Sequence, residues 1–133
     1  IKDSSGSPGN QAENIRRFGS KISVLAGAAD MTLPTLTMGG KGAILAVANA
    51  IPETCVALYD AAVKGDLVEA GRIQLKVSYV NKVLVREHSQ IAATKTALKS
   101  RGYPAGEPRR PLRPLPSGEE KQVVEEFMLR EAL

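Results

Sequence analysis

The sequence contains no tryptophan, one cysteine and one histidine, and each shortage narrows the classes of protein to which it can belong. A single cysteine cannot form an internal disulfide, and it fits the reducing conditions of a cytoplasmic protein. One histidine argues against a histidine-based metal site and against a histidine-dependent catalytic triad. We therefore expect no metal centre.

Aromatic residues make up only 4% of the 133 residues, and no apolar run approaches the length of a membrane-spanning helix. A formal net charge of +4 is too small to indicate a nucleic-acid-binding protein, and few aromatic side chains are present to stack on bases. No secretion signal is visible in the first residues. Because the first residue is Ile1 and a motif follows it at once, we expect the chain to be the later part of a longer polypeptide.

What the sequence does contain is the composition of a globular domain, with 43% apolar and 24% charged residues. Short apolar runs at residues 1–2, 22–26 and 43–47 alternate with helical patterns at residues 11–18 and 31–38. Continuous apolar runs of this length are typical of parallel strands that are buried on both faces. The spacing therefore predicts βα units.

After residue 49 the pattern is helical throughout. Pro52 and Gly65 bound a helix over residues 52–64, and Asp66 with Glu69 forms a capping box for the next helix, over 67–87. Two more helices are predicted over 90–101 and 117–133, with a proline-rich connector at 103–116. We therefore expect βα units over residues 1–64 and a helical region over residues 65–133. The pattern leaves open whether the strands form a small open sheet or the last strands of a barrel.

The helix over residues 67–87 carries apolar residues on more than one side. One stripe consists of Ile73, Val77, Val80 and Leu84, and the other positions are Leu75, Tyr79 and Val83. A helix that is apolar around much of its circumference is buried or lies at an interface. We therefore expect this helix to meet another subunit of a homo-oligomer.

Lys2 is the most informative residue of the sequence. It follows a short apolar start and is followed by a small polar turn, Asp3-Ser4-Ser5-Gly6. A lysine at the end of a strand, held away from water, loses its proton more easily. The neutral amine is a nucleophile that forms a Schiff base with a ketone. The ordinary alternative is a solvated lysine on the surface.

Four segments of the chain match, in order, the motifs of a known family. They are residues 1–6 (IKDSSG), 25–30 (LAGAAD), 39–49 (GGKGAILAVAN) and a tail with KTAL at 95–98 and RPLRPL at 110–115. The chain resembles the C-terminal part of the dihydrodipicolinate synthase and N-acetylneuraminate lyase family. These are pyruvate-dependent class I aldolases built on a (β/α)8 barrel with a C-terminal helical extension.

The resemblance implies an α/β fold: the last three βα units of a TIM barrel, followed by helices. It implies a Schiff-base lyase or synthase for aldol condensation or cleavage involving pyruvate, with no cofactor, a small-molecule substrate and a homotetrameric assembly. It assigns the catalytic role to Lys2 and contacts with the substrate to Ser4, Gly27 and Ile44. From the residues alone, Ser4 could equally be a turn hydroxyl, Gly27 a tight strand end and Ile44 a core residue.

The segment Asp3-Ser4-Ser5-Gly6 differs from the Glu-Ala-Thr-Gly that lysine-pathway synthases of the family carry after the lysine. It is closer to members that cleave 2-keto-3-deoxy sugar acids or 4-hydroxy-2-oxoglutarate. The aldehyde partner and the direction of the reaction therefore stay open. The alternative is a barrel-derived binding or scaffold protein of the same family without catalysis.

Three further features have plain structural interpretations. The glycines at 39–42 precede a strand and lack the spacing of a phosphate-binding loop. Cys55 is expected to be a small buried hydrophobe, and His88 a surface residue at a helix end.

Overall fold

The computed structural model describes residues 1–131 and the side chains of residues 1–129. The predicted apolar position Leu133 of the last helix lies outside the described residues. The chain divides into two compact units, Ile1–Ser78 and the part from Tyr79 onward. Each unit is described by itself.

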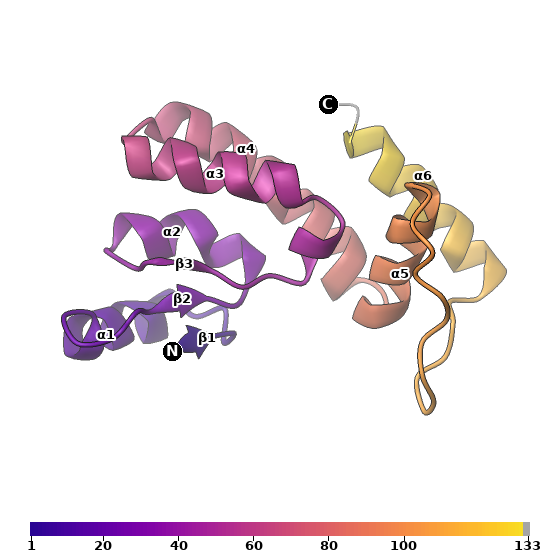
Figure 1. Ribbon diagram of the computed structural model, residues 1–133, viewed down its shortest axis with the longest axis horizontal. Helices are drawn as coiled ribbons and strands as arrows, with labels where there is room; N and C mark the ends of the chain where they lie inside the picture. The colour runs from indigo at the N-terminus through magenta and orange to yellow at the C-terminus, as the bar shows by residue number, and fades with distance from the viewer. Residues whose placement is uncertain (132–133) are drawn as a thin grey trace. The chain divides into compact units, whose positions relative to one another are not determined.

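The first unit contains a three-stranded parallel sheet in the order β1-β2-β3 (Figure 1). The strands are β1 (Lys2–Asp3), β2 (Leu25–Ala26) and β3 (Gly42–Ala43). The register pairs Lys2 with Leu25 and Leu25 with Gly42. One residue further on, Asp3 pairs with Ala26 and Ala26 with Ala43. The predicted alternation of parallel strands and helices is therefore confirmed.

The second and third strands are shorter than predicted. Ile22 lies in the turn that ends the first helix, because its N–H donates to Phe18 O at 2.9 Å. The predicted strand over 43–47 ends at Ala43, and the 3₁₀ helix η2 (Val47–Asn49) begins at Val47. Backbone bonds to neighbouring segments, rather than the length of the apolar run, decide where each strand ends.

The two faces of the sheet differ in what covers them. Side chains alternate between the faces of a strand. Asp3 and Ala26 point toward the helices, since Asp3 bonds Asn14 of the first helix and Ala26 is fully buried. Lys2 lies on the opposite face and is exposed. The residues described here thus leave the face that carries Lys2 open.

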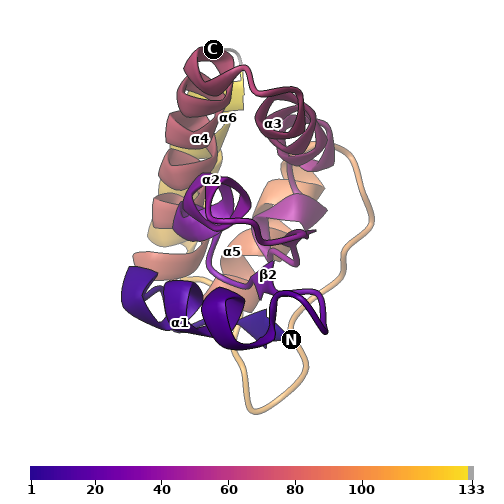
Figure 2. The same ribbon diagram turned by 90° about the vertical axis from the view of Figure 1, so that its left-hand side faces the viewer.

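Helix α1 (Pro8–Phe18) begins three residues before the predicted start. Ser7 is its N-cap, with Oγ accepting from Asn10 N–H at 3.2 Å, and Pro8 occupies the first helical turn, where proline is favoured. The 3₁₀ helix η1 (Ala29–Met31) leads into α2 (Thr32–Thr37), with Pro34 in its first turn. Figure 2 shows α1 and α2 side by side.

Helices α3 (Pro52–Lys64) and α4 (Leu67–Asn81) are joined by a short turn that matches the prediction. Gly65 has a left-handed backbone with φ 81°, and Asp66 Oδ1 accepts from Glu69 N–H at 3.0 Å. The second bond of the predicted capping box, from Asp66 N–H to the Glu69 side chain, was wrong. The Glu69 carboxylate accepts from the Arg72 guanidinium instead. A buried glutamine, Gln74, ties α4 to the segment of η1 and α2. Its Nε2 donates to Ala29 O at 3.0 Å, and its Oε1 accepts from Leu33 N–H at 2.8 Å.

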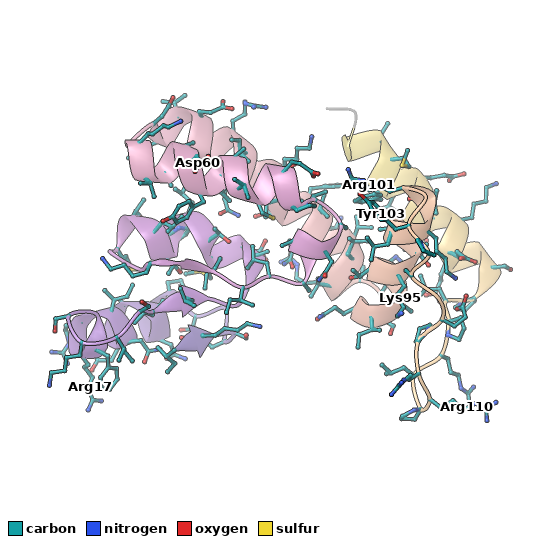
Figure 3. All side chains as sticks on the ribbon, in the orientation of Figure 1. Arg17, Asp60, Lys95, Arg101, Tyr103 and Arg110 are labelled. Carbon is teal, nitrogen blue, oxygen red and sulfur yellow. The ribbon has the colours of Figure 1, made fainter. Side chains whose placement is uncertain are left out.

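The second unit consists of the end of α4, the π-helix η3 (Lys82–Arg86), α5 (Gln90–Ser100) and α6 (Ser117–Glu131). Its core includes the buried side chains of Val83, Leu84, Ala93, Ala97, Val123 and Phe127. The connector between α5 and α6 is extended, and Lys95 Nζ donates to Ala105 O at 2.5 Å to hold it (Figure 3). Within the described residues no helix is long and apolar enough to cross a membrane.

Two expectations for the second unit were wrong. Val83, predicted off the main apolar stripe of its helix, is fully buried, because the π-helix to which it belongs packs against α5 and α6. The side chain of His88, predicted at the surface, is only 8% exposed, and its Nδ1 lies 3.3 Å from Glu119 Oε2 at the start of α6.

Candidate functional site

Three of the four predicted site residues follow the strands directly. Ser4 follows β1, Gly27 follows β2 and Ile44 follows β3. Backbone bonds extend the sheet register to this row, since Gly27 N–H donates to Asp3 O at 2.7 Å and Ile44 N–H donates to Ala26 O at 2.8 Å. The row therefore forms the carboxyl edge of the sheet, the edge at which parallel βα folds place their reactive groups.

Lys2, Ser4 and Gly27 lie in contact. A Cβ atom placed on Gly27 would overlap Ser4 Oγ and would lie 2.8 Å from Lys2 Cε. The missing side chain at Gly27 is therefore what lets the lysine and the serine lie against this strand. The structure brings Gly27 together with Lys2 and Ser4, which precede it by 25 and 23 positions along the chain. The catalytic and binding roles of these residues stay predictions.

Ile44 occupies the same edge but is joined to the other residues through the backbone. The bond from its N–H to Ala26 O places Ile44 level with the end of β2. Ile44 is 52% exposed. Lys2 is exposed as well. The described residues therefore form one side of a site and leave the side facing Lys2 uncovered.

The loop after Lys2 is held by a series of side-chain to backbone bonds. Asp3 Oδ1 accepts from Ser5 N–H at 2.8 Å, and Ser5 Oγ accepts from Ser7 N–H at 3.2 Å. These bonds are typical Asx and Ser turns. The capping hydroxyls are thus those of Ser5 and Ser7, while Ser4 Oγ lies against Gly27.

Asp3 and Asn14 are site residues that reasoning from the sequence missed. Asn14 Nδ2 donates to Asp3 Oδ2 at 3.0 Å, which ties α1 to β1. Hydrogen bonds from Ser5, and a smaller contribution from Asn14, hold the pKa of Asp3 below its usual range, because they favour the ionised carboxylate. An aspartate two residues before a serine is the signal for the turn at Asp3, whereas no sequence pattern pointed to Asn14.

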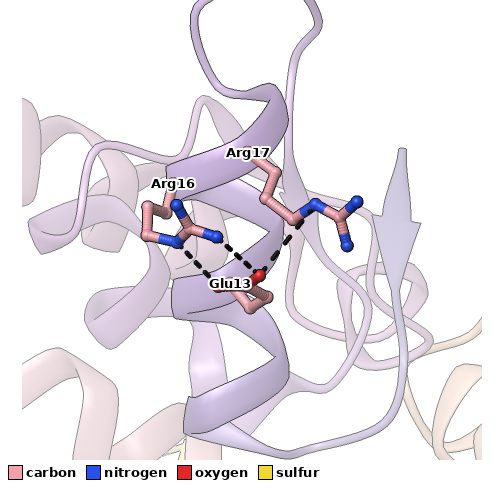
Figure 4. A network of polar contacts seen from close by, with 3 residues as sticks. All are labelled: Glu13, Arg16 and Arg17. Atoms are coloured by element: carbon pink, nitrogen blue, oxygen red, sulfur yellow. Dashed lines mark hydrogen bonds and ion pairs between the residues drawn. The ribbon is translucent and has the colours of Figure 1, made fainter.

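The exposed side of α1 carries an ionic cluster around Glu13, a residue that also lines a hollow with Lys2 and Ser4. Glu13 lies between Arg16, whose Nε is 2.8 Å from Glu13 Oε2, and Arg17, whose Nε is 3.9 Å from Glu13 Oε1 (Figure 4). The hydrogen bond from Arg16 lowers the pKa of Glu13. All three side chains are at least half exposed, so the pairs contribute little to stability.

A second hollow, of about 360 Å³, lies beside β3 and is lined mainly by apolar groups. Ala43, Leu45, Val56 and Tyr59 line it together with Cys55. Burial raises the pKa of the Cys55 thiol to about 11, so the thiol is a poor nucleophile at neutral pH. Cys55 is partly rather than fully buried, as its place on this hollow explains.

The glycines at 39–42 have structural roles. Gly39, with φ 101°, follows the end of α2, and a Cβ on Gly40 would lie 2.8 Å from Thr35 O. In the part of the chain that the structure describes, no three histidine, cysteine, aspartate or glutamate side chains gather as a metal ion would require.

Taken together, these features define three consecutive βα units with a lysine and a small polar loop at the carboxyl edge, followed by helices. The chain belongs to the dihydrodipicolinate synthetase family, whose model matches residues 1–129. The predicted family and the predicted fold, the C-terminal part of its TIM barrel, are both confirmed.

Named relatives agree with this family. The 4-hydroxy-tetrahydrodipicolinate synthase of Methanocaldococcus jannaschii is 40% identical over 108 residues, which cover 81% of this chain and 37% of the relative. The crystal structure of dihydrodipicolinate synthase from Aquifex aeolicus matches 98% of this chain and 44% of its own with a TM-score of 0.86 and 30% identity. Proteus mirabilis N-acetylneuraminate lyase matches 99% of this chain and 44% of its own with a TM-score of 0.83 and 26% identity. The chain spans less than half the length of these relatives.

Proposed function

We propose that residues 1–64 are the last three βα units, and residues 65–133 the helical region, of a pyruvate-dependent class I aldolase or synthase. Lys2 is the Schiff-base lysine, and Ser4, Gly27 and Ile44 contact the substrate. The observation that carries the proposal is the contact of Lys2 and Ser4 with Gly27 at the carboxyl edge of the sheet. Relatives named as synthases and lyases support the same reaction class.

The proposed reaction begins when the neutral Lys2 amine attacks the keto carbon of pyruvate or of a 2-keto-3-deoxy acid. Loss of water forms a protonated imine, which withdraws electrons from the neighbouring carbon. Loss of a proton from that carbon gives an enamine, which adds to an aldehyde; the reverse sequence cleaves an aldol. Hydrolysis of the imine then frees Lys2. Because the imine is the electron sink, this sequence needs no metal or organic cofactor.

The site needs a wall opposite Lys2, and we propose that the remaining strands of a barrel supply it. The face of the sheet that carries Lys2 is open in the residues described, and β3 has a strand neighbour, β2, on one side only among them. The hollow at Val56 and Tyr59 lies beside the other edge of β3, and both side chains are more than 40% exposed. A further βα unit adding at this edge would cover these apolar groups.

We further propose a cytoplasmic homotetramer. Val68 and Leu75 are 87% and 75% exposed and lie seven residues apart, on one side of α4. Large apolar side chains exposed in this way are suited to a subunit interface. The single cysteine supports a reducing compartment.

The test is borohydride reduction with pyruvate in the assembled barrel that contains these residues, followed by peptide mapping. We expect one reduced adduct, on Lys2. Lys2→Arg should abolish both adduct and turnover, because arginine stays protonated. Lys41→Arg, at an exposed lysine just before β3, is the matched control and should leave both unchanged. An adduct on another lysine would refute the role of Lys2, and no adduct with any 2-keto acid while the barrel is intact would favour a binding protein without this chemistry.

A further inference from the structure

Asp3 is held by three parts of the structure at once. Its Oδ1 accepts from Ser5 N–H in the loop, its Oδ2 accepts from Asn14 Nδ2 in α1, and its backbone oxygen accepts from Gly27 N–H at the end of β2. The distances are 2.8, 3.0 and 2.7 Å. Any rotation of β1 about its own axis would break at least one of these bonds.

Lys2 and Ser4 flank Asp3 and point to the opposite face of the strand. The direction of Asp3 therefore sets the direction of both neighbours. With Asp3 turned toward α1, Lys2 Cε and Ser4 Oγ come to lie against the bare backbone of Gly27. The bond between Asp3 and Asn14 lies on the helix side of the strand, and both residues line a hollow with Lys2 and Ser4.

We propose that Asp3 and Asn14 are a positioning pair, whose hydrogen bond fixes the rotation of β1 so that Lys2 and Ser4 converge over Gly27. The inference rests on the proposed function, since it concerns how the Schiff-base lysine is aimed. In this proposal the pair acts by setting the direction of β1, and the reacting amine is that of Lys2.

The pair can be tested by exchanging its two side chains. Asn14→Asp sets two carboxylates against each other at hydrogen-bond distance, where like charges repel. Adding Asp3→Asn restores a donor facing an acceptor, and the new amide oxygen at residue 3 still accepts from Ser5 N–H. Ala12→Asp adds the same charge at an exposed position on the other side of α1 and serves as the control.

The first measurement is the rate at which borohydride traps pyruvate on Lys2 in the assembled barrel, well below the lowest melting temperature of the set. We expect Asn14→Asp to slow trapping by roughly tenfold or more, since small misplacements of reacting groups have large effects on rate. The double variant Asp3→Asn with Asn14→Asp should regain most of the parental rate, and Ala12→Asp should keep it.

Parental trapping in Asn14→Asp, with only a lower melting temperature, would overturn the inference, because a merely structural bond affects stability alone. Failure of the exchanged pair to regain the rate would also overturn it. Hydrogen exchange of the Ser5 and Gly27 amides is the second measurement. If the parent traps nothing, the proposed function fails. The positioning role then stands if exchange of these amides is faster in Asn14→Asp and restored in the double variant, and it fails if exchange is unchanged.

Discussion

Replacing Gly27 by alanine should damage the site more than the fold. The added Cβ would overlap Ser4 Oγ, and it would lie 2.8 Å from Lys2 Cε and 2.9 Å from Asp3 O. Ordinary contacts begin at 3.4 Å, so Lys2 Cε has to move by about 0.6 Å, the difference between 3.4 and 2.8 Å. Asp3 O belongs to the backbone and cannot turn aside, which strains its 2.7 Å bond with Gly27 N–H.

The expected loss of unfolding free energy is about 1–3 kcal/mol, the usual range for overpacking. A displacement of a reacting group by about 1 Å can lower a rate by ~10²-fold, so we expect Lys2 to be trapped with pyruvate about tenfold more slowly. Thermal unfolding and borohydride trapping of the assembled barrel measure the two effects. Gly71→Ala on α4 is the control, because a Cβ there meets nothing within 4 Å and should stabilise the helix by about 0.5–1 kcal/mol. Wild-type stability and trapping in Gly27→Ala would refute the predicted contact.

Three more predictions concern other parts of the chain. Because burial raises the pKa of Cys55 from 9.0 to about 11, iodoacetamide should alkylate it at pH 8 about 100-fold more slowly than in the urea-unfolded chain. The unfolding free energy should also fall as the pH rises from 9 toward 11, because only the unfolded chain then loses the thiol proton. Mass spectrometry measures the alkylation and thermal melts the stability, and equal alkylation rates would contradict the prediction. Asp66→Ala removes the cap of α4 and should cost about 1 kcal/mol in denaturant unfolding, whereas exposed Asp60→Ala should be near neutral. Val68→Glu with Leu75→Glu should lower the sedimentation coefficient of the assembly, and an unchanged coefficient would exclude this side of α4 as an interface.

Features that depend on a few neighbouring residues could be read from the sequence. Pro52 and Gly65 bounded α3, and Asp66 capped α4, because each acts through local backbone geometry. Strand ends could not be read in the same way. The chain leaves the sheet at Ala43 although the apolar run continues, because the bonds of the neighbouring segments decide where pairing stops.

The site was predictable to the extent that it lies in contiguous motifs. The motif residues Lys2, Ser4 and Gly27 were selected from the sequence, and the structure brings them into contact. Asn14 was not selected, because its bond to Asp3 depends on the phase of α1 against β1, which neither segment contains alone. Val83 was misassigned for a related reason, since its burial depends on how this segment packs against α5 and α6.

The π-helix at Lys82–Arg86 also bears on how relatives of this protein should be aligned. A turn closed by a bond from residue i+5 to residue i, as between Glu87 N–H and Lys82 O, holds one residue more than an α-helical turn. A relative with one residue fewer in this stretch could end the same helix with an α-helical turn and keep the residues before and after that turn. A single-residue gap between such a relative and this chain therefore belongs within residues 82–86, and placing it earlier would shift the buried positions of α4 by one.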